Sequence, residues 1–145
     1  DVEIFDENVT EENIDKIAGN ADIIFSCAPL FEERFLLNEA AIKGGKKLVD
    51  CAMYSMEGQV MTMLPGITPC LKCIYPDKPT QWERKFPVIG AVSSLVAQIG
   101  VIEGIKLLCN FQKSSLGKLI RIDASSMDVK KIELLPKRVD CLACN

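Results

Sequence analysis

The feature that most constrains this chain is a pair of Cys-x-x-Cys motifs that lie far apart in the sequence. Cys70 and Cys73 form the first motif, and Cys141 and Cys144 form the second, close to the last residue. Two thiolates in one tight turn can face a single ion, and a second pair completes the tetrahedral shell that zinc prefers. The separation is too long for an autonomous zinc finger. We therefore predict a structural zinc site that ties the chain terminus to an already folded domain.

Two other kinds of site also use closely spaced cysteines. An iron-sulfur site takes the same four thiolates, and the sequence does not separate it from a zinc site. A thioredoxin-type redox pair needs its motif at the start of a helix beside a strand, a setting that we predict for neither motif. The remaining cysteines, Cys27, Cys51 and Cys109, occur singly among apolar residues. A cysteine in such surroundings usually packs as a small hydrophobe, so we predict that all three lie in the core.

Composition narrows the function further. The 145 residues, 48% apolar and 26% charged, are typical of one globular domain. The net charge of −3 gives no broad attraction for nucleic acid or an anionic membrane, so we expect neither as a partner. The chain has no histidine, which excludes a histidine base or a histidine-bound metal within these residues. No stretch approaches the roughly 20 apolar residues of a membrane span and no signal peptide is evident, so we expect a cytoplasmic location.

The pattern of apolar residues predicts an α/β fold. Up to residue 51, helix and strand segments alternate, which is typical of a parallel sheet with covering helices. Later segments alternate apolar and polar residues with a period of two, which predicts antiparallel strands and a C-terminal hairpin. The pattern predicts three helices, which are one from an N-cap at Thr10 to Gly19, one at 31–43 and a largely buried one at 88–108. It predicts strands at 23–25, 48–51, 58–64, 117–123 and 129–134, of which 58–64 is open on one face. A long loop is predicted at 75–87.

Short motifs occur along nearly the whole chain in a specific order. They are Asn13-Ile14, Ala21-Asp22-Ile23-Ile24, Phe31 with Arg34 and Asn38, Leu48-Val49, Gly58-Gln59-Val60, Pro65 to Cys73, Ile89-Gly90, Ile102 to Lys106, and the final Cys-x-x-Cys. In this order and spacing they resemble the ThiF/MoeB/HesA adenylyltransferases. That family activates the C-terminus of ubiquitin-like proteins and sulfur carriers.

The resemblance implies a fold, cofactors and partners. The chain would be a single domain, residues 1–145, with zinc knuckles at 70–73 and 141–144 and a crossover loop at about 74–87. Its fold would be the C-terminal part of a Rossmann-like mixed sheet with flanking helices and antiparallel C-terminal strands. The four cysteines would hold structural zinc, and the enzyme would be a homodimer. With ATP and magnesium it would adenylate the terminal glycine of a ubiquitin-like or sulfur-carrier protein.

Three departures from the family pattern touch its chemistry. The chain begins after the family's glycine-rich loop, phosphate-facing arginine and catalytic lysine, so it resembles the C-terminal half of a longer domain. Where the family reads Asp-Cys-Thr-Asp, residues 26–29 read Ser-Cys-Ala-Pro, and Pro29 cannot bind magnesium. The crossover loop has no cysteine, so we do not expect a thioester step. We assign no catalytic and no cofactor-binding residue, and we expect this chain alone to be inactive.

Five residues are candidates for binding the partner's tail. Arg34 and Asn38 lie one helical turn apart at positions that the family places near that tail, although a solvated Arg with a surface Asn fits the pattern equally well. Gly58 and Gln59 lie on a predicted strand within the family motif. Trp82 would either anchor a partner or pin its loop to the domain.

Two functions from different classes follow from these observations. The first is ATP-dependent adenylation of a ubiquitin-like or sulfur-carrier protein, to which this chain contributes the zinc site and the partner-binding half. The alternative is a degenerate, non-catalytic member that acts as a protein-binding module, which Pro29 favours. A zinc-ribbon nucleic-acid binder is disfavoured because neither knuckle is flanked by a basic and aromatic patch.

Overall fold

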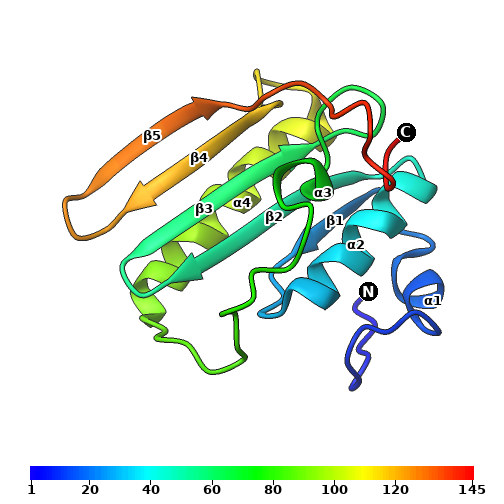
Figure 1. Cartoon of the computed structure of the whole chain (residues 1–145), viewed down its shortest axis with the longest axis horizontal. Helices are drawn as coiled ribbons and strands as arrows, with labels where there is room; N and C mark the ends of the chain where they lie inside the picture. Colours follow the sequence, from blue (N-terminus) through cyan, green and yellow to red (C-terminus); the bar gives the residue numbers. More distant parts are fainter.

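A five-stranded sheet forms the centre of the computed structural model, which describes all residues from 1 to 145 (Figure 1). Neighbouring strands follow the order of the chain. The first two strands are parallel, and every later neighbour is antiparallel, so the predicted mixed sheet and C-terminal hairpin are confirmed. The strands are β1 (Ile23–Ser26), β2 (Lys47–Tyr54), β3 (Glu57–Met63), β4 (Lys118–Asp123) and β5 (Asp128–Glu133).

Helices cover both faces of the sheet (Figure 1). On one face lies α2 (Phe31–Lys43), which matches the predicted range, together with the short helices α1 (Ile14–Ala18) and α3 (Leu71–Ile74). On the other face lies α4 (Gly90–Cys109). Residues 75–87 contain no helix or strand, as predicted.

Two apolar cores lie on opposite sides of the sheet. Leu48 and Met61 point toward α2, whereas Val49 and Val60 point toward α4. Successive side chains of a strand point to opposite faces, so both faces of β2 and β3 need a cover. The expectation that β3 is open on one face is therefore wrong for its second half, where every residue from 60 to 63 is buried.

The first helix begins later than predicted. Thr10 does not cap it: α1 starts at Ile14, and Asn13 occupies the N-cap position. The Asn13 Oδ1 atom accepts the backbone N–H of Thr10 at 2.8 Å, so the polar side chain closes a turn ahead of the helix. Gly19 follows the last residue, as predicted.

The long helix α4 is only partly buried, contrary to the prediction. One side packs on the sheet, where a Cβ atom added to Gly100 would lie 2.4 Å from the Cys51 Sγ atom. The opposite side leaves apolar side chains in solvent, among them Val101 at 42% exposed, Ile102 at 52% and Ile105 at 47%. The sequence is apolar over most of the helix surface, but the sheet covers only one side of it.

This helix also contradicts the expectation that no segment is long and apolar enough to cross a membrane. By length and composition alone, α4 meets that criterion, and no other helix of the chain does. The core helix of a globular domain meets the same criterion, so one such helix is weak evidence.

The three single cysteines do not share one environment. Cys51 on β2 is buried, as predicted. Cys27, just after β1, and Cys109, the last residue of α4, are exposed, so the prediction of a core position is wrong for both. Cys27 directly follows the last residue of β1, and Cys109 ends α4, so each lies at the margin of the packed core.

Candidate functional site

The four cysteines of the two Cys-x-x-Cys motifs lie together. Their sulfur atoms are all within 4.8 Å of one another. The Cys70 Sγ atom lies 3.8 Å from that of Cys73 and 3.7 Å from that of Cys141, and the Cys73 and Cys144 Sγ atoms are 3.5 Å apart. Four sulfur atoms bonded to one zinc ion at about 2.3 Å would be about 3.8 Å from one another in a tetrahedron. The spacing therefore fits a single tetrahedral metal ion.

The folded core positions the first pair. After β3 the chain turns at Gly66, whose φ of 80° lies in the left-handed region that glycine adopts readily. The Thr68 Oγ1 atom accepts the Leu64 backbone N–H at 2.9 Å and closes this turn. The Asn38 Oδ1 atom on α2 accepts the Leu71 backbone N–H at 2.9 Å. Asn38 therefore orients the start of α3, next to the first pair, and is not the surface residue of the solvated alternative.

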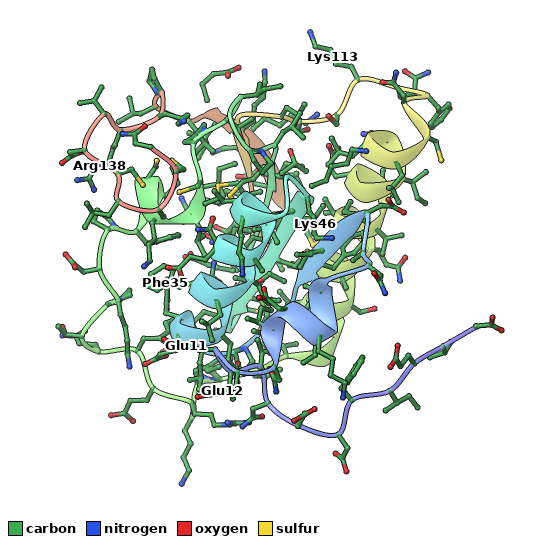
Figure 2. All side chains as sticks on the ribbon, turned by 90° about the vertical axis from the view of Figure 1, so that its right-hand side faces the viewer. Glu11, Glu12, Phe35, Lys46, Lys113 and Arg138 are labelled. Atoms are coloured by element: carbon green, nitrogen blue, oxygen red, sulfur yellow. The ribbon has the colours of Figure 1, made fainter.

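The second pair lies on the C-terminal segment, which folds back toward α3. Figure 2 shows sulfur atoms gathered beside the loop that carries Arg138. Arg138 forms a pair with Asp140 at 2.7 Å, and the Lys137 Nζ atom donates to the Cys144 carbonyl oxygen at 2.7 Å. These contacts stabilise the turn that carries the two thiols of the segment.

The electrostatics of the cluster favour a thiolate on Cys141, whereas burial and hydrogen bonds with the neighbouring thiols raise the pKa of Cys144. Burial raises the pKa of Cys141, but backbone hydrogen bonds from Ala143 and Cys144 outweigh it and lower the pKa to about 7. Burial raises the pKa of the Cys70 thiol. A bound cation would deprotonate such a thiol, since a coordinating thiol binds as the thiolate. The possible ligands are cysteine sulfur atoms, and backbone N–H groups point at one of them, Cys141. Such a set of ligands fits zinc.

Two rival interpretations of these cysteines fit less well. A cluster of several iron and sulfide atoms needs wider sulfur spacing than these four cysteines have, although a single iron ion bound by four thiolates would have the same spacing as zinc. Against expectation, the first motif does begin a helix after a strand, because Cys70 is the N-cap of α3. That helix has only four residues, however, and its sulfur atoms face the second pair.

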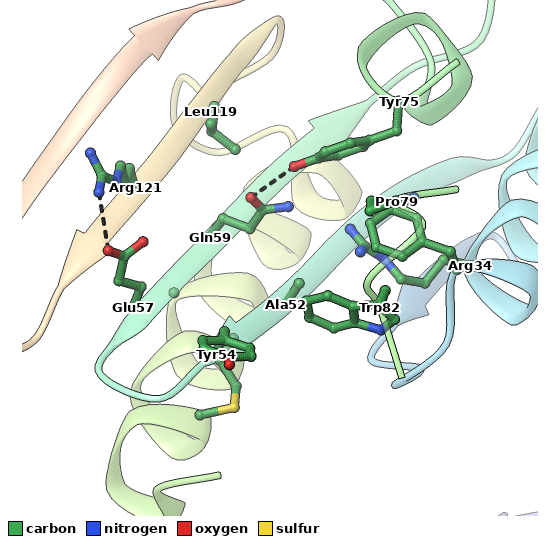
Figure 3. Close-up of a pocket in the computed structure, with 13 residues that line it drawn as sticks. Arg34, Ala52, Tyr54, Glu57, Gln59, Tyr75, Pro79, Trp82, Leu119 and Arg121 are labelled. Atoms are coloured by element: carbon green, nitrogen blue, oxygen red, sulfur yellow. Dashed lines mark hydrogen bonds and ion pairs between the residues drawn. The ribbon is translucent and has the colours of Figure 1, made fainter. Parts of the chain in front are cut away.

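A cavity of about 240 Å³ lies over β2 and β3, bounded by the loop 75–87 (Figure 3). Four of the five predicted partner-binding residues line it, and Asn38 does not. The lining residues are Phe31, Arg34, Ala52, Met53, Tyr54, Glu57, Gly58, Gln59, Tyr75, Pro79, Trp82, Leu119 and Arg121. We call this cavity the sheet groove.

Arg34 is buried at the sheet groove and is not solvated. It forms a bidentate pair with Asp50 on β2, with Nε to Oδ1 at 3.0 Å and Nη2 to Oδ2 at 2.6 Å. Their side chains are 3% and 0% exposed. The guanidinium also lies 4.5 Å from the centroid of the Phe31 ring, a cation–π contact. Sequence reasoning missed Asp50, because nothing in a buried strand marks one acid as the partner of an arginine on the preceding helix.

Trp82 pins the loop 75–87 to its own domain. Its indole N–H donates to the Pro29 carbonyl oxygen at 2.8 Å. Its ring also packs edge-on against Phe31 at 5.5 Å and lies 5.2 Å from the Phe86 ring, between centroids. Of the two predicted roles for Trp82, the structure shows this one. The same ring forms one wall of the sheet groove.

Gly58 and Gln59 reach opposite faces of β3. The Gln59 Oε1 atom accepts the Tyr75 hydroxyl at 3.1 Å in the sheet groove, as Figure 3 shows. A Cβ atom on Gly58 would lie 2.3 Å from the Val96 Cγ2 atom on α4. Gly58 is therefore required for close packing of α4, and only its backbone lines the groove.

The end of β1 does not fit a magnesium ion. Pro29 has no ligand atom in its side chain, and its carbonyl oxygen already accepts the Trp82 indole N–H. Ser26 is fully buried, and Cys27 offers sulfur, which magnesium does not prefer. The Asp50 carboxylate is occupied by Arg34. The residues at the end of β1 therefore do not form a binding site for the magnesium ion of a nucleotide.

Comparison with known sequences shows the same resemblance along the chain. A family model described as the ThiF family matches residues 1–143. Protein HesA of Nostoc sp. is 40% identical over 144 residues, which are 99% of this chain and 56% of the relative. The adenylyltransferase and sulfurtransferase MOCS3-1 of Drosophila pseudoobscura pseudoobscura is 30% identical over 128 residues, 86% of this chain and 28% of the relative. The chain thus spans about half the length of the HesA protein that it matches.

Comparison with solved structures shows the same fold at low identity. The crystal structure of E. coli MccB superimposes with a TM-score of 0.75 at 16% identity, over 97% of this chain and 44% of that one. The structure of E. coli MccB with ATP gives a TM-score of 0.73 at 15% identity, over 94% and 44%. At this identity the likeness concerns the fold alone.

Proposed function

Since the chain belongs to the ThiF family, we propose that it forms the metal-binding and partner-binding part of an enzyme that adenylates the C-terminus of a ubiquitin-like or sulfur-carrier protein. The observation that carries this proposal is the family match over residues 1–143. The names of relatives support it, because the Drosophila protein is described as an adenylyltransferase and sulfurtransferase. In this proposal the groups that hold ATP and magnesium come from residues outside this sequence.

The sheet groove is the proposed site for the partner's tail. An extended Gly-Gly segment is narrow and has no side chains, so it fits a shallow cavity bounded by aromatic residues. Arg34 uses two N–H donors on Asp50, and a guanidinium has five, which leaves donors for a terminal carboxylate. The Gln59 amide offers a further hydrogen-bonding group to the backbone of the tail.

The metal site has a structural role in this proposal. Four thiolates fill a tetrahedral zinc shell and leave no position for water or substrate. Tyr75 lies two residues after Cys73, and its hydroxyl donates to Gln59 in the sheet groove. An ion there would fix one wall of the groove as well as the C-terminal segment. We propose zinc, because its bond length of about 2.3 Å to sulfur matches the spacing of the four sulfur atoms.

We further propose that the chain is not monomeric in solution. The solvent-facing side of α4 presents apolar side chains in a row, and soluble proteins rarely leave such a face uncovered. A homodimer would cover it. Sedimentation at micromolar concentration should find a dimer, and substituting Ile102 and Ile105 by Asp should give a monomer with unchanged helix content. A wild-type monomer would contradict this part of the proposal.

The groove proposal is tested by binding. The 145-residue chain is titrated with a ubiquitin-like or sulfur-carrier protein that ends in Gly-Gly, and with the same protein lacking those two residues. We expect the truncated partner to lose about tenfold or more in affinity, because the tail supplies the contacts in the groove. Gln59→Phe, which fills the groove, should weaken binding similarly. Lys113→Ala, in the loop after α4, is the matched control. Equal affinity for both partners would rule out the groove as the tail site.

A non-catalytic binding module is the second candidate, and Pro29 is the observation that favours it. The two candidates make the same prediction for binding and differ in turnover. ATP-pyrophosphate exchange is therefore measured on a family-length protein that contains this sequence, with a Gly-Gly partner. Exchange supports the enzyme. Tail-dependent binding without exchange supports the module.

A further inference from the structure

A second cavity, of about 230 Å³, lies between the carboxyl ends of β1 and β2 and the first half of α4. Its lining is mostly apolar, and it includes two of the three cysteines that do not belong to the metal cluster, Cys27 and Cys51. Neither takes part in the proposed adenylation. Their shared position in one cavity needs a separate explanation.

The strand register places these two cysteines side by side. Ser26 on β1 pairs with Asp50 on β2 in a parallel ladder, so Cys27 and Cys51 are the next residues on the two chains. Neighbouring strands are about 4.8 Å apart, which lies within the Cα separations that disulfides span. Both side chains point toward α4, because each follows a residue that points to the other face. Gly100 on α4 leaves the room that the Cys51 sulfur occupies.

The two thiols differ in access and acidity. Cys27 is exposed, whereas Cys51 is buried. A hydrogen bond from the Cys51 thiol lowers the pKa of Cys27 to about 7, against the effects of burial and of the Asp50 charge. The same hydrogen bond and burial raise the pKa of Cys51. This pairing of an accessible thiolate with a protected thiol is the arrangement of an attacking and a resolving cysteine.

We propose that Cys27 and Cys51 form a reactive dithiol that a low-molecular-weight disulfide, such as glutathione disulfide, oxidises to an internal disulfide. The Cys27 thiolate attacks one sulfur of the small disulfide, and the first small thiolate leaves. The Cys51 thiol then loses its proton and attacks the Cys27 sulfur, and the second small thiolate leaves. The protein loses two hydrogen atoms in total, and one small disulfide is reduced to two thiols.

The position of the pair predicts a reversible bond. A disulfide between neighbouring strands must draw together two side chains that the ladder holds parallel, and strained, accessible disulfides are readily reduced. Because β1 ends at Ser26, Cys27 lies beyond the ladder and can adjust. The bond would join the turn at 26–29 to β2 on one wall of this cavity.

The test uses the full 145-residue chain loaded with zinc. The protein is incubated with excess glutathione disulfide at pH 7, alkylated, and digested. A protease that cleaves after glutamate is required. Trypsin would leave Cys51 and Cys70 in one peptide, whereas cleavage after Glu57 separates them. We expect a cross-linked peptide that joins Cys27 to Cys51, absent after dithiothreitol, together with an intact mass lower by two hydrogens.

Three variants separate this proposal from general thiol oxidation. In Cys51→Ala, oxidation should stop at a stable glutathione adduct on Cys27. Alkylation of Cys27 by iodoacetamide at pH 7 should also slow about fivefold in this variant, because the thiolate fraction of Cys27 falls more than its nucleophilicity rises. Cys27→Ala should leave Cys51 unmodified. Cys109→Ser, which removes the other exposed single thiol, should still form the internal disulfide.

Several results would overturn the proposal. A stable glutathione adduct on Cys27 of the wild type would show that Cys51 cannot resolve it. Modification of Cys51 at the same rate with and without Cys27 would show two independent thiols. A cross-link to any cysteine of the metal cluster, with the zinc still bound, would place Cys27 in a different redox pair.

Discussion

At the scale of single residues, Arg34 lines the sheet groove and forms a buried ion pair with Asp50. An ion pair in the interior is costly to form, because both charges lose their hydration, and it is more costly to break from one side. The Arg34 guanidinium lies over the Phe31 ring and donates hydrogen bonds to the Asp50 carboxylate. Each charged group is therefore held by several contacts at once.

Replacing Asp50 by Asn should destabilise the protein by about 3 to 5 kcal/mol, because an isosteric amide leaves the Arg34 charge buried without a counter-ion. Urea unfolding followed by circular dichroism measures the change. The exposed pair of Lys43 and Asp15, with side chains 73% and 68% exposed, is the matched control. Asp15→Asn should change stability by less than about 1 kcal/mol. Equal effects of the two substitutions would show that the Arg34 pair is not dehydrated in solution.

The metal cluster gives a second prediction at this scale. Metal analysis of the purified chain should find close to one zinc per monomer. The double substitution Cys141→Ser and Cys144→Ser should lose the metal, because two thiolates alone make an incomplete shell. Hydrogen exchange should then show a loosened C-terminal segment. Cys109→Ser should retain full zinc content, and retention in the double variant as well would refute the assignment of ligands.

At the scale of elements, patterns along the sequence predicted most helices and strands. The range of α2 is confirmed residue for residue, since Gly44 and Gly45 follow an apolar period with no competing pattern. The predictions failed where burial depends on what covers an element. Apolar residues over most of its surface predicted that α4 is buried, and the alternation in β3 predicted one open face. Periodicity reflects the type of each side chain but not which layers lie next to the element. The four metal-site cysteines were visible as motifs, but Asp50 and the Cys27–Cys51 pair depend on register between distant segments.

Gly58 allows α4 to pack closely against β3. Gly58→Ala should cost about 1 to 3 kcal/mol, because the new methyl group would overlap the buried, β-branched Val96, which has little rotamer freedom in a helix. Thermal unfolding monitors this loss. Gly90→Ala at the start of α4, where a Cβ atom meets nothing within 4 Å, should be within about 0.5 kcal/mol of wild type. If Gly58→Ala is also neutral, then α4 can shift away from β3 at no cost.

At the scale of the whole molecule, the chain combines the sheet groove with a four-cysteine cluster that could hold a metal ion, and the end of β1 has no groups that fit magnesium. We therefore expect no ATP-pyrophosphate exchange by these 145 residues with any ubiquitin-like partner. Losing one donor to a developing charge typically costs about a hundredfold or more in rate, and here several are absent. The assay is radiolabelled exchange with a partner that ends in Gly-Gly. Exchange that EDTA abolishes would show that other residues of this chain bind the nucleotide.

The fold also has a topological consequence. With an ion bound to all four cysteines, the chain between Cys73 and Cys141 becomes a closed ring that contains α4, β4 and β5, and the loop 75–87 lies on this ring (Figure 1). A single proteolytic cut in that loop would open the ring and divide the chain into two fragments. The ion would still join them, because one fragment carries Cys70 and Cys73 and the other carries Cys141 and Cys144. The nicked protein should therefore run as one species in mild urea and separate into two fragments when a chelator is added. The ion would act as a removable cross-link, and a nicked chain that separates equally well without a chelator would show that the ring does not close.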